Sequence, residues 1–102
     1  MIDYYYHPNG SVSVEQYTES INGKILLHNE DGPSIISFDQ DGNIAIKAYY
    51  FNGVRHRLDG PAYLKYHKNG RVILKSYHLY GENINVKTQK QFLKYVRLMA
   101  FK

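Results

Sequence analysis

The sequence predicts a mainly β protein: a single-layer antiparallel β-meander of about three hairpin repeats, followed by a C-terminal amphipathic α-helix. Three observations predict this fold. Turn dipeptides ending in glycine recur along the chain, and the segments between them alternate apolar and polar residues with the period of strands. After Asn85 the apolar period lengthens to that of a helix. A chain of 102 residues is sized for one domain, 1–102.

The turn sequences define the repeat units. One series of turn dipeptides is Asn9-Gly10, Asp41-Gly42 and Asn69-Gly70, and a second is Asn22-Gly23, Asn52-Gly53 and Tyr80-Gly81. The pattern His-x-x-Asp-Gly-Pro begins at His28 and again at His56, 28 residues later. These positions give units of about 2–31, 32–59 and 60–85, and the third unit lacks the closing His-x-x-Asp-Gly-Pro.

Each unit is predicted to be a β-hairpin. Its two strands flank a four-residue connection that ends in glycine, as a type I turn closed by a left-handed residue requires. The corner between units is assigned to three structural turn residues, Asp31, Gly32 and Pro33, and again to Asp59, Gly60 and Pro61. We expect the aspartate to bond the backbone ahead of it, the glycine to adopt a positive φ, and the proline to stand at a strand start or edge.

Strand alternation assigns the two faces of the sheet. The even-numbered face is expected to be the core, with Tyr4, Tyr6, Val12, Val14, Ile36, Phe38, Ile44, Ile46, Tyr50, Leu64, Tyr66, Val72 and Leu74. The odd-numbered face is expected to be solvated, with Tyr5, Tyr17, Tyr49, Tyr63 and Tyr77 among Lys47, Lys65 and Lys75. A β-bulge would invert this assignment downstream of its position.

The last segment, 86–101, is predicted to be a helix, because it contains neither glycine nor proline and Thr88 is a suitable N-cap. Its apolar stripe comprises Phe92, Leu93, Val96, Met99 and Ala100, and its opposite side carries Lys87, Lys90, Lys94 and Arg97. We expect this helix to cover the open end of the sheet, since a repeat array needs an atypical last element.

Charge is divided sharply along the chain. Residues 1–46 contain one cation and seven acidic residues, a net charge of −6, whereas residues 47–102 contain twelve cations and two acidic residues, a net charge of +10. Such a division steers anionic partners to the C-terminal half or promotes head-to-tail association. The chain has no cysteine, no apolar run long enough to span a membrane, and an N-terminus without basic residues, so we expect a soluble, unexported, cytoplasmic protein.

The segment His56-Arg57-Leu58-Asp59-Gly60-Pro61-Ala62, together with Tyr49-Tyr50-Phe51-Asn52-Gly53 before it, resembles a repeat found in proteins of bacteriophages, giant viruses and some bacteria. Those repeats are similar to MORN repeats, which build single-layer β-meanders. The resemblance covers roughly residues 4–81, with unit one departing at Asn29, Glu30 and Ser34. It implies a binding or scaffold role, including antitoxin-like proteins and phage inhibitors or accessory factors that act on a host protein, and it implies no catalysis.

Enzyme chemistry is not expected from this sequence. The two His/Asp pairs, His28 with Asp31 and His56 with Asp59, are its one constellation suited to metal binding or proton relay. Zinc needs three or four convergent ligands, and repetition at equivalent positions favours a structural role for these pairs. Motifs for a nucleophile elbow, a P-loop or a zinc protease are absent from the chain. We therefore expect no catalytic residues, no metal and no cofactor.

The expected function is partner binding, with three alternatives. The first is a protein-interaction module that uses its tyrosine and lysine face or its positive end: Tyr49, Tyr63, Tyr77, Lys47, Lys65, Lys75, Lys90, Lys94 and Arg97. The second is a nucleic-acid-binding protein that stacks single-stranded bases on the same tyrosines, with Arg55, Arg57 and Arg71 extending the positive field. The third is a self-assembling homo-oligomer, in which the acidic end of one copy meets the basic end of the next. A membrane-surface role is disfavoured because the chain has no tryptophan.

Overall fold

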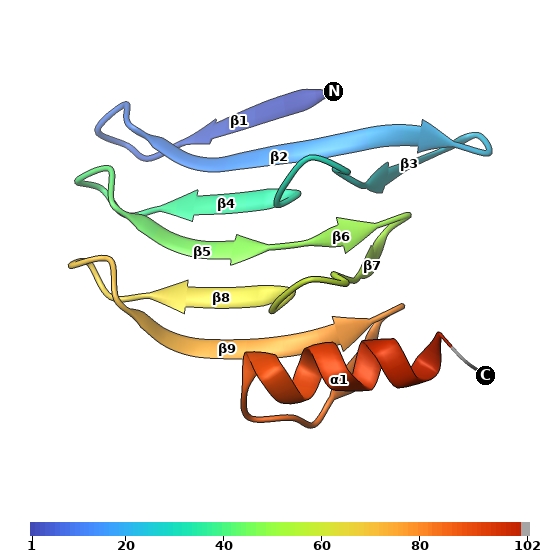
Figure 1. Ribbon diagram of the computed structural model, residues 1–102. Helices are drawn as coiled ribbons and strands as arrows, with labels where there is room; N and C mark the ends of the chain where they lie inside the picture. Colours follow the sequence, from blue (N-terminus) through green and yellow to red (C-terminus); the bar gives the residue numbers. More distant parts are fainter. Residues whose placement is uncertain (101–102) are drawn as a thin grey trace.

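The computed structural model describes residues 1–100 and confirms a mainly β chain with one C-terminal helix (Figure 1). Its elements are β1 Ile2–Tyr6, β2 Val12–Ile21, β3 Lys24–Leu27, β4 Ile35–Phe38, β5 Ile44–Ala48, β6 Tyr50–Phe51, β7 Val54–Arg55, β8 Tyr63–Tyr66, β9 Val72–Leu79, β10 Glu82–Ile84 and α1 Gln89–Met99. The main sheet is antiparallel and runs β1-β2-β4-β5-β8-β9-β10, with β3 paired to β2, while β6 and β7 form a separate ladder. The strands lie in a single layer in chain order, and α1 lies beside β9 (Figure 1).

Each repeat unit contains two hairpins. The longer hairpins, β1-β2, β4-β5 and β8-β9, turn through four residues that end in Gly10, Gly42 and Gly70, whose φ angles are +90°, +87° and +91°. The shorter hairpins are β2-β3, β6-β7 and β9-β10. Each turns through two residues that both have positive φ, as in a type I′ turn. Asn22 and Asn52 suit the first of these positions, whereas Tyr80 adopts a φ of +50° there without the side chain that normally favours it.

The predicted division into one apolar and one solvated face is wrong. The register of neighbouring strands places odd-numbered residues opposite even-numbered ones, because the strand pairing shifts by one residue next to each four-residue turn. One row of paired residues therefore reads Tyr4, Glu15, Ile36, Lys47, Leu64, Lys75, and a row on the other face reads Tyr5, Val14, Ser37, Ile46, Lys65, Leu74. Both faces mix apolar and charged side chains, and many of the expected core residues are half-buried or exposed.

The apolar core lies at the C-terminal end, beneath the helix. Tyr77, Leu79, Ile84 and Phe92 are buried together, with Val86 and Val96 packed against them. The Tyr77 and Phe92 rings lie 4.6 Å apart between centroids. The molecule is only 18 Å along its shortest axis, so most of the sheet is a single layer without a second apolar layer on either side.

The helix is shorter than the predicted segment 86–101, of which Phe101 lies outside the described residues. Thr88 is the N-cap, as expected, and forms a capping box: its Oγ1 accepts from Gln91 N while Gln91 Oε1 accepts from Thr88 N. The Gln91 side chain also accepts from Lys87 N, which holds the chain in a non-helical turn before the cap. The buried stripe is narrower than predicted, because Leu93 and Met99 are about two-fifths exposed.

Histidines join each unit to the next. His28 Nδ1 accepts a hydrogen bond from Asn52 N at 3.0 Å, and His56 Nδ1 accepts from Tyr80 N at 2.8 Å. Each histidine thus binds the first residue of the following type I′ turn. Ile84 follows Gly81 at the distance at which His56 follows Gly53, so the third unit carries a buried apolar residue where the others carry the histidine.

The Asp-Gly-Pro corners differ from the prediction in two ways. Gly32 and Gly60 are not among the residues with positive φ, so their conformational freedom is not the reason for glycine here. A Cβ on Gly60 would lie 3.0 Å from Cζ of Arg57, so glycine leaves room for the guanidinium in its observed position. The Asp59 carboxylate accepts from Arg57 Nε at 2.8 Å instead of bonding the backbone ahead.

Candidate binding surfaces

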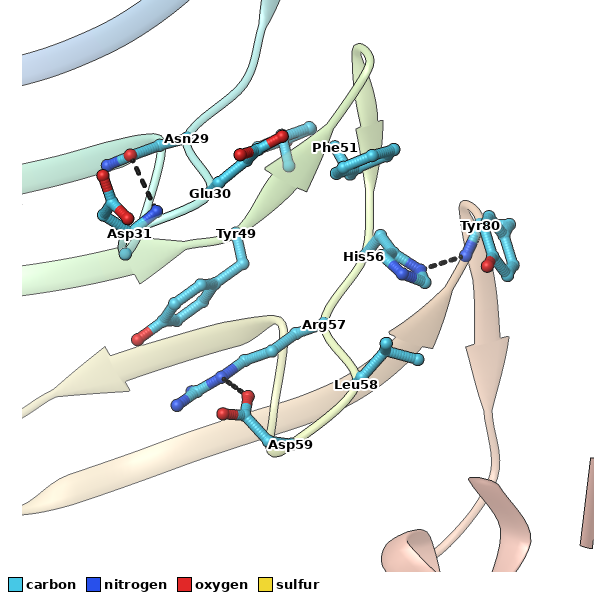
Figure 2. Close-up of a pocket in the computed structure, with 12 residues that line it drawn as sticks. Asn29, Glu30, Asp31, Tyr49, Phe51, His56, Arg57, Leu58, Asp59 and Tyr80 are labelled. Carbon is cyan, nitrogen blue, oxygen red and sulfur yellow. Dashed lines mark hydrogen bonds and ion pairs between the residues drawn. The ribbon is translucent and has the colours of Figure 1, made fainter. Parts of the chain in front are cut away.

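A shallow groove of about 570 Å³ opens between the first and second corners of the chain (Figure 2). Its lining comes from all three units: Asn29, Glu30, Asp31, Gly32, Tyr49, Tyr50, Phe51, His56, Arg57, Leu58, Asp59 and Tyr80. Aromatic rings and Arg57 form one part of this lining, and three carboxylates, those of Glu30, Asp31 and Asp59, form another. The groove is therefore mixed in character, with no excess of positive charge.

Arg57 is the most constrained charged residue of the groove. Its guanidinium lies 4.0 Å from the centroid of the Tyr49 ring, its Nε donates to Asp59 and its Nη1 donates to the carbonyl of Pro61 at 3.1 Å. In unit one, the equivalent residue is Asn29, whose Nδ2 donates to the carbonyl of Pro33 at 3.0 Å. This shorter side chain makes the same hydrogen bond across the corner. Arg57 is therefore committed to the corner, and its charge is balanced by Asp59.

A ladder of aromatic rings borders the groove. Ring centroids lie 4.8 Å apart for His28 and Phe51, 5.9 Å apart for Phe51 and His56, and 4.2 Å apart for His56 and Tyr80. Burial lowers the pKa of His56 below its ordinary value. A neutral imidazole suits both the ring stacking and the hydrogen bond that Tyr80 N donates to His56 Nδ1. Because these rings come from successive units, their stacking is a structural contact between units.

The predicted tyrosine and lysine surface is not one surface. Tyr49 and Lys47 lie on one face, where Lys47 Nζ is 5.8 Å from the Tyr66 ring. Tyr63 pairs with Ala48 and Ser76, which places it and Lys65 on the other face, with Arg55 stacked at 4.7 Å. Tyr77 is 2 % exposed beneath Phe92. The strand register therefore separates the three tyrosines. The prediction that Tyr49, Tyr63 and Tyr77 form one exposed row is wrong.

The positive end keeps its predicted residues accessible. Lys90, Lys94 and Arg97 are exposed along α1, and Lys75 is exposed on β9. Leu93, Tyr95 and Leu98 of the helix are 39, 39 and 58 % exposed among them. Helix α1 contains no acidic residue, and the close contacts between acidic and basic side chains within residues 1–100 are His28 with Glu30 and Arg57 with Asp59. The described part of the chain therefore offers these helix cations no counter-ion.

The His/Asp pairs considered for metal binding are not brought together. His28 Nε2 lies 3.5 Å from Glu30 Oε1, Asp31 N donates to Asn29 Oδ1, and Asp59 pairs with Arg57. No group of three or more acidic or histidine side chains in residues 1–100 has the arrangement of a metal site. Within the same range, no helix has the length and apolar character needed to cross a membrane.

The fold and its surfaces define a class: a β-hairpin repeat sheet with a C-terminal helix and an exposed, positively charged end. No protein-family model matches the sequence, and searches of curated proteins and of solved structures find no match. The resemblance to MORN-like repeats stays a prediction. Phe51, Tyr66 and Tyr80 are ring contacts that were not predicted as site residues; the 28-residue repeat, which aligns Tyr80 with Asn52 and His56 with His28, is the signal that could have indicated the contact between Tyr80 and His56.

Proposed function

We propose that this protein is a non-enzymatic interaction module that binds an acidic protein partner on the outward side of α1. The observation that carries the proposal is the combination found there: Lys90, Lys94 and Arg97 without counter-ions in the described chain, interleaved with exposed Leu93, Tyr95 and Leu98. A protein hot spot needs apolar contact area as well as charge, and this helix offers both.

A protein partner is favoured over single-stranded nucleic acid by the arrangement of the tyrosines. Base stacking along a strand needs several accessible rings on one track. Here Tyr77 is buried, Tyr63 lies on the opposite face from Tyr49, and one side of the Tyr49 ring is occupied by Arg57. In the context of the MORN-like resemblance, the partner would be a host protein in the host cytoplasm, and this chain a phage-encoded inhibitor or accessory factor.

The test is an affinity capture from host extract with three forms of the protein: wild type, a Lys90→Glu/Lys94→Glu variant, and a Lys24→Glu/Lys68→Glu variant. The two variants have the same change in net charge, but only the first alters α1. We expect the wild type and the second variant to retain an acidic protein and the helix variant to lose it. Equal retention by all three would remove α1 as the binding surface.

A polyanion control separates the two partner classes. Fluorescence anisotropy with single-stranded DNA and RNA, at low and physiological salt, measures the charge-driven background. We expect weak binding that disappears at physiological salt. Tight binding that survives physiological salt and is lost in the helix variant would contradict a protein partner and favour the nucleic-acid alternative.

A further inference from the structure

Two stretches of the main sheet have an edge without a strand partner, β1 at one end and the first part of β9 at the other, where β10 covers only the last part of β9. Strand β1 pairs with β2 alone, and the first part of β9, residues 72–76, pairs with β8 alone. Both edges expose apolar side chains: Tyr4 and Tyr5 are 47 and 50 % exposed on β1, and Ile73 and Leu74 are 49 and 54 % exposed on β9. An open edge with apolar side chains is a template for another strand.

The chain contains two internal examples of the contact that would fill these edges. Where unit one meets unit two, Val14, Glu15 and Gln16 pair with Ser37, Ile36 and Ile35. Where unit two meets unit three, Ile46, Lys47 and Ala48 pair with Lys65, Leu64 and Tyr63. In both junctions, the paired residues lie at the same distances along the chain from the turn glycines of their own hairpins, Gly10, Gly42 and Gly70. Unit three presents those positions as Leu74, Lys75 and Ser76, and unit one presents the complementary positions as Tyr5, Tyr4 and Asp3.

We propose that a second copy of this chain binds at β9 through its own β1, in the register Leu74 to Tyr5, Lys75 to Tyr4 and Ser76 to Asp3. The contact repeats the geometry of the two internal junctions, so the sheet continues from one copy into the next, head to tail. It uses the sheet edges and not the outward side of α1, and therefore goes beyond the proposed function.

Charge favours this direction of assembly. The β1 end of the chain carries Asp3, Glu15 and Glu19, and within residues 1–100 none of them forms an ion pair. The β9 end carries Lys65, Arg71 and Lys75, which also lack one in that range. Like ends repel and unlike ends attract, which favours β1 against β9 over β1 against β1.

The junction between copies would be weaker than the internal ones. Each internal junction is held by a histidine, His28 or His56, that accepts from the turn of the next unit. Unit three has Ile84 at that position and offers no acceptor to the turn of a following copy. The pairing would therefore be reversible and concentration-dependent.

The hydrogen-bonding direction along each strand identifies the backbone groups that the junction uses. Along a strand, the N–H groups of every second residue point to the same side. Tyr17 N donates to Ser34 O and Tyr49 N donates to Ala62 O, both towards the next unit. The N–H groups two positions earlier, those of Glu15 and Lys47, therefore also point towards the next unit. The equivalent residue of unit three is Lys75, whose N–H therefore points out from the free edge. On β1, Thr18 N donates to Met1 O, so Asp3 and Tyr5 bond inward and Tyr4 points outward.

Proline at these two positions blocks the junction without removing an internal hydrogen bond. Tyr4→Pro closes the β1 edge and Lys75→Pro closes the β9 edge, while Tyr4→Ala keeps the N–H and serves as the control. In sedimentation velocity, we expect the mean mass of wild type and Tyr4→Ala to rise with concentration and each proline variant alone to stay monomeric. An equimolar mixture of the two proline variants should form a dimer, because each contributes one intact edge.

Three results would overturn the proposal: a wild type that is monomeric throughout, a mixture of proline variants that stays monomeric, or self-association of either proline variant. Circular dichroism checks that both variants are folded. A second measurement avoids proline: because the chain has no cysteine, Tyr5→Cys and Leu74→Cys variants mixed under mild oxidation should form one heterodimeric disulfide. These residues would form a pair without mutual hydrogen bonds, where Cα atoms lie about 4.5 Å apart. No heterodimer, or equal homodimers of each variant, would exclude the register.

Discussion

At the residue scale, the imidazoles of His28 and His56 are the most specific connections between units. Each uses Nδ1 as an acceptor for a backbone N–H of the next type I′ turn. Protonation places a hydrogen on both ring nitrogens, so the charged form loses this acceptor. The repeated histidine is therefore explained by a neutral, hydrogen-bonded role between hairpins.

We predict that acidification destabilises the fold through His56. Burial lowers its pKa, so its contribution to stability is complete above the unfolded value near 6.5 and is lost as the pH falls through the lower, folded value. His56→Asn retains an acceptor but does not titrate. Urea unfolding between about pH 7.5 and pH 5 should show a smaller loss of stability in His56→Asn than in wild type.

Part of the acid sensitivity should persist in that variant, because burial and the nearby Arg55 also lower the pKa of His78. If His56→Asn loses stability on acidification to the same extent as wild type, the imidazole is not the group that couples pH to folding.

A substitution at Tyr77 is predicted to stabilise the fold. Its hydroxyl is buried and has no hydrogen-bond partner within the described residues. Removing an unsatisfied buried hydroxyl relieves a desolvation penalty, so Tyr77→Phe should stabilise the fold by about 1 kcal/mol. Thermal and urea unfolding measure this change, and a destabilisation of the same size would show that the hydroxyl has a partner.

At the element scale, the cap of α1 controls the core because the helix supplies Phe92 to it. Thr88→Ala removes the side-chain acceptor for Gln91 N and should cost about 1 kcal/mol. Thr88→Ser retains the acceptor and is the matched control. Urea unfolding of the three proteins would contradict the assignment if Ala and Ser were equally stable.

The sequence predicted the elements better than their faces. The turn glycines predicted the longer hairpins β1-β2, β4-β5 and β8-β9, and Thr88 predicted the helix start, because both depend on local backbone conformation. The shorter hairpins β2-β3, β6-β7 and β9-β10 were not predicted, since each unit was expected to contain one hairpin. The two-face pattern failed because a one-residue shift of register next to each turn is not visible in the alternation. The roles of Gly60 and Arg57 were missed because they depend on a contact across the corner.

The same distinction holds for the candidate binding residues. Lys90, Lys94 and Arg97 lie where the sequence placed them, because a helix has one geometry and its polar side follows from its apolar stripe. Tyr49, Tyr63 and Tyr77 do not share a surface, because their positions depend on the pairing of four strands.

At the scale of the whole molecule, apolar burial is concentrated at one end. The cluster of Tyr77, Leu79, Ile84 and Phe92 lies in unit three and α1, whereas the buried side chains of unit one and its junction include Thr18, His28 and Ser34. Units one and two are held chiefly by strand pairing, by the histidines and by half-buried side chains. In a repeat array of this kind, local stability follows the local contacts.

The C-terminal unit and helix α1 anchor the sheet and leave β1 as its least stable strand. Native-state amide hydrogen exchange resolved by NMR, at a concentration where the protein is monomeric, measures this difference in local stability. We expect protection to be greatest in β8 and β9 and to fall towards β1, with the inward-bonded amides of Asp3 and Tyr5 exchanging about tenfold or more faster than those of Leu74 and Ser76. Protection in β1 equal to or greater than that in β9 would show that the C-terminal unit does not anchor the sheet.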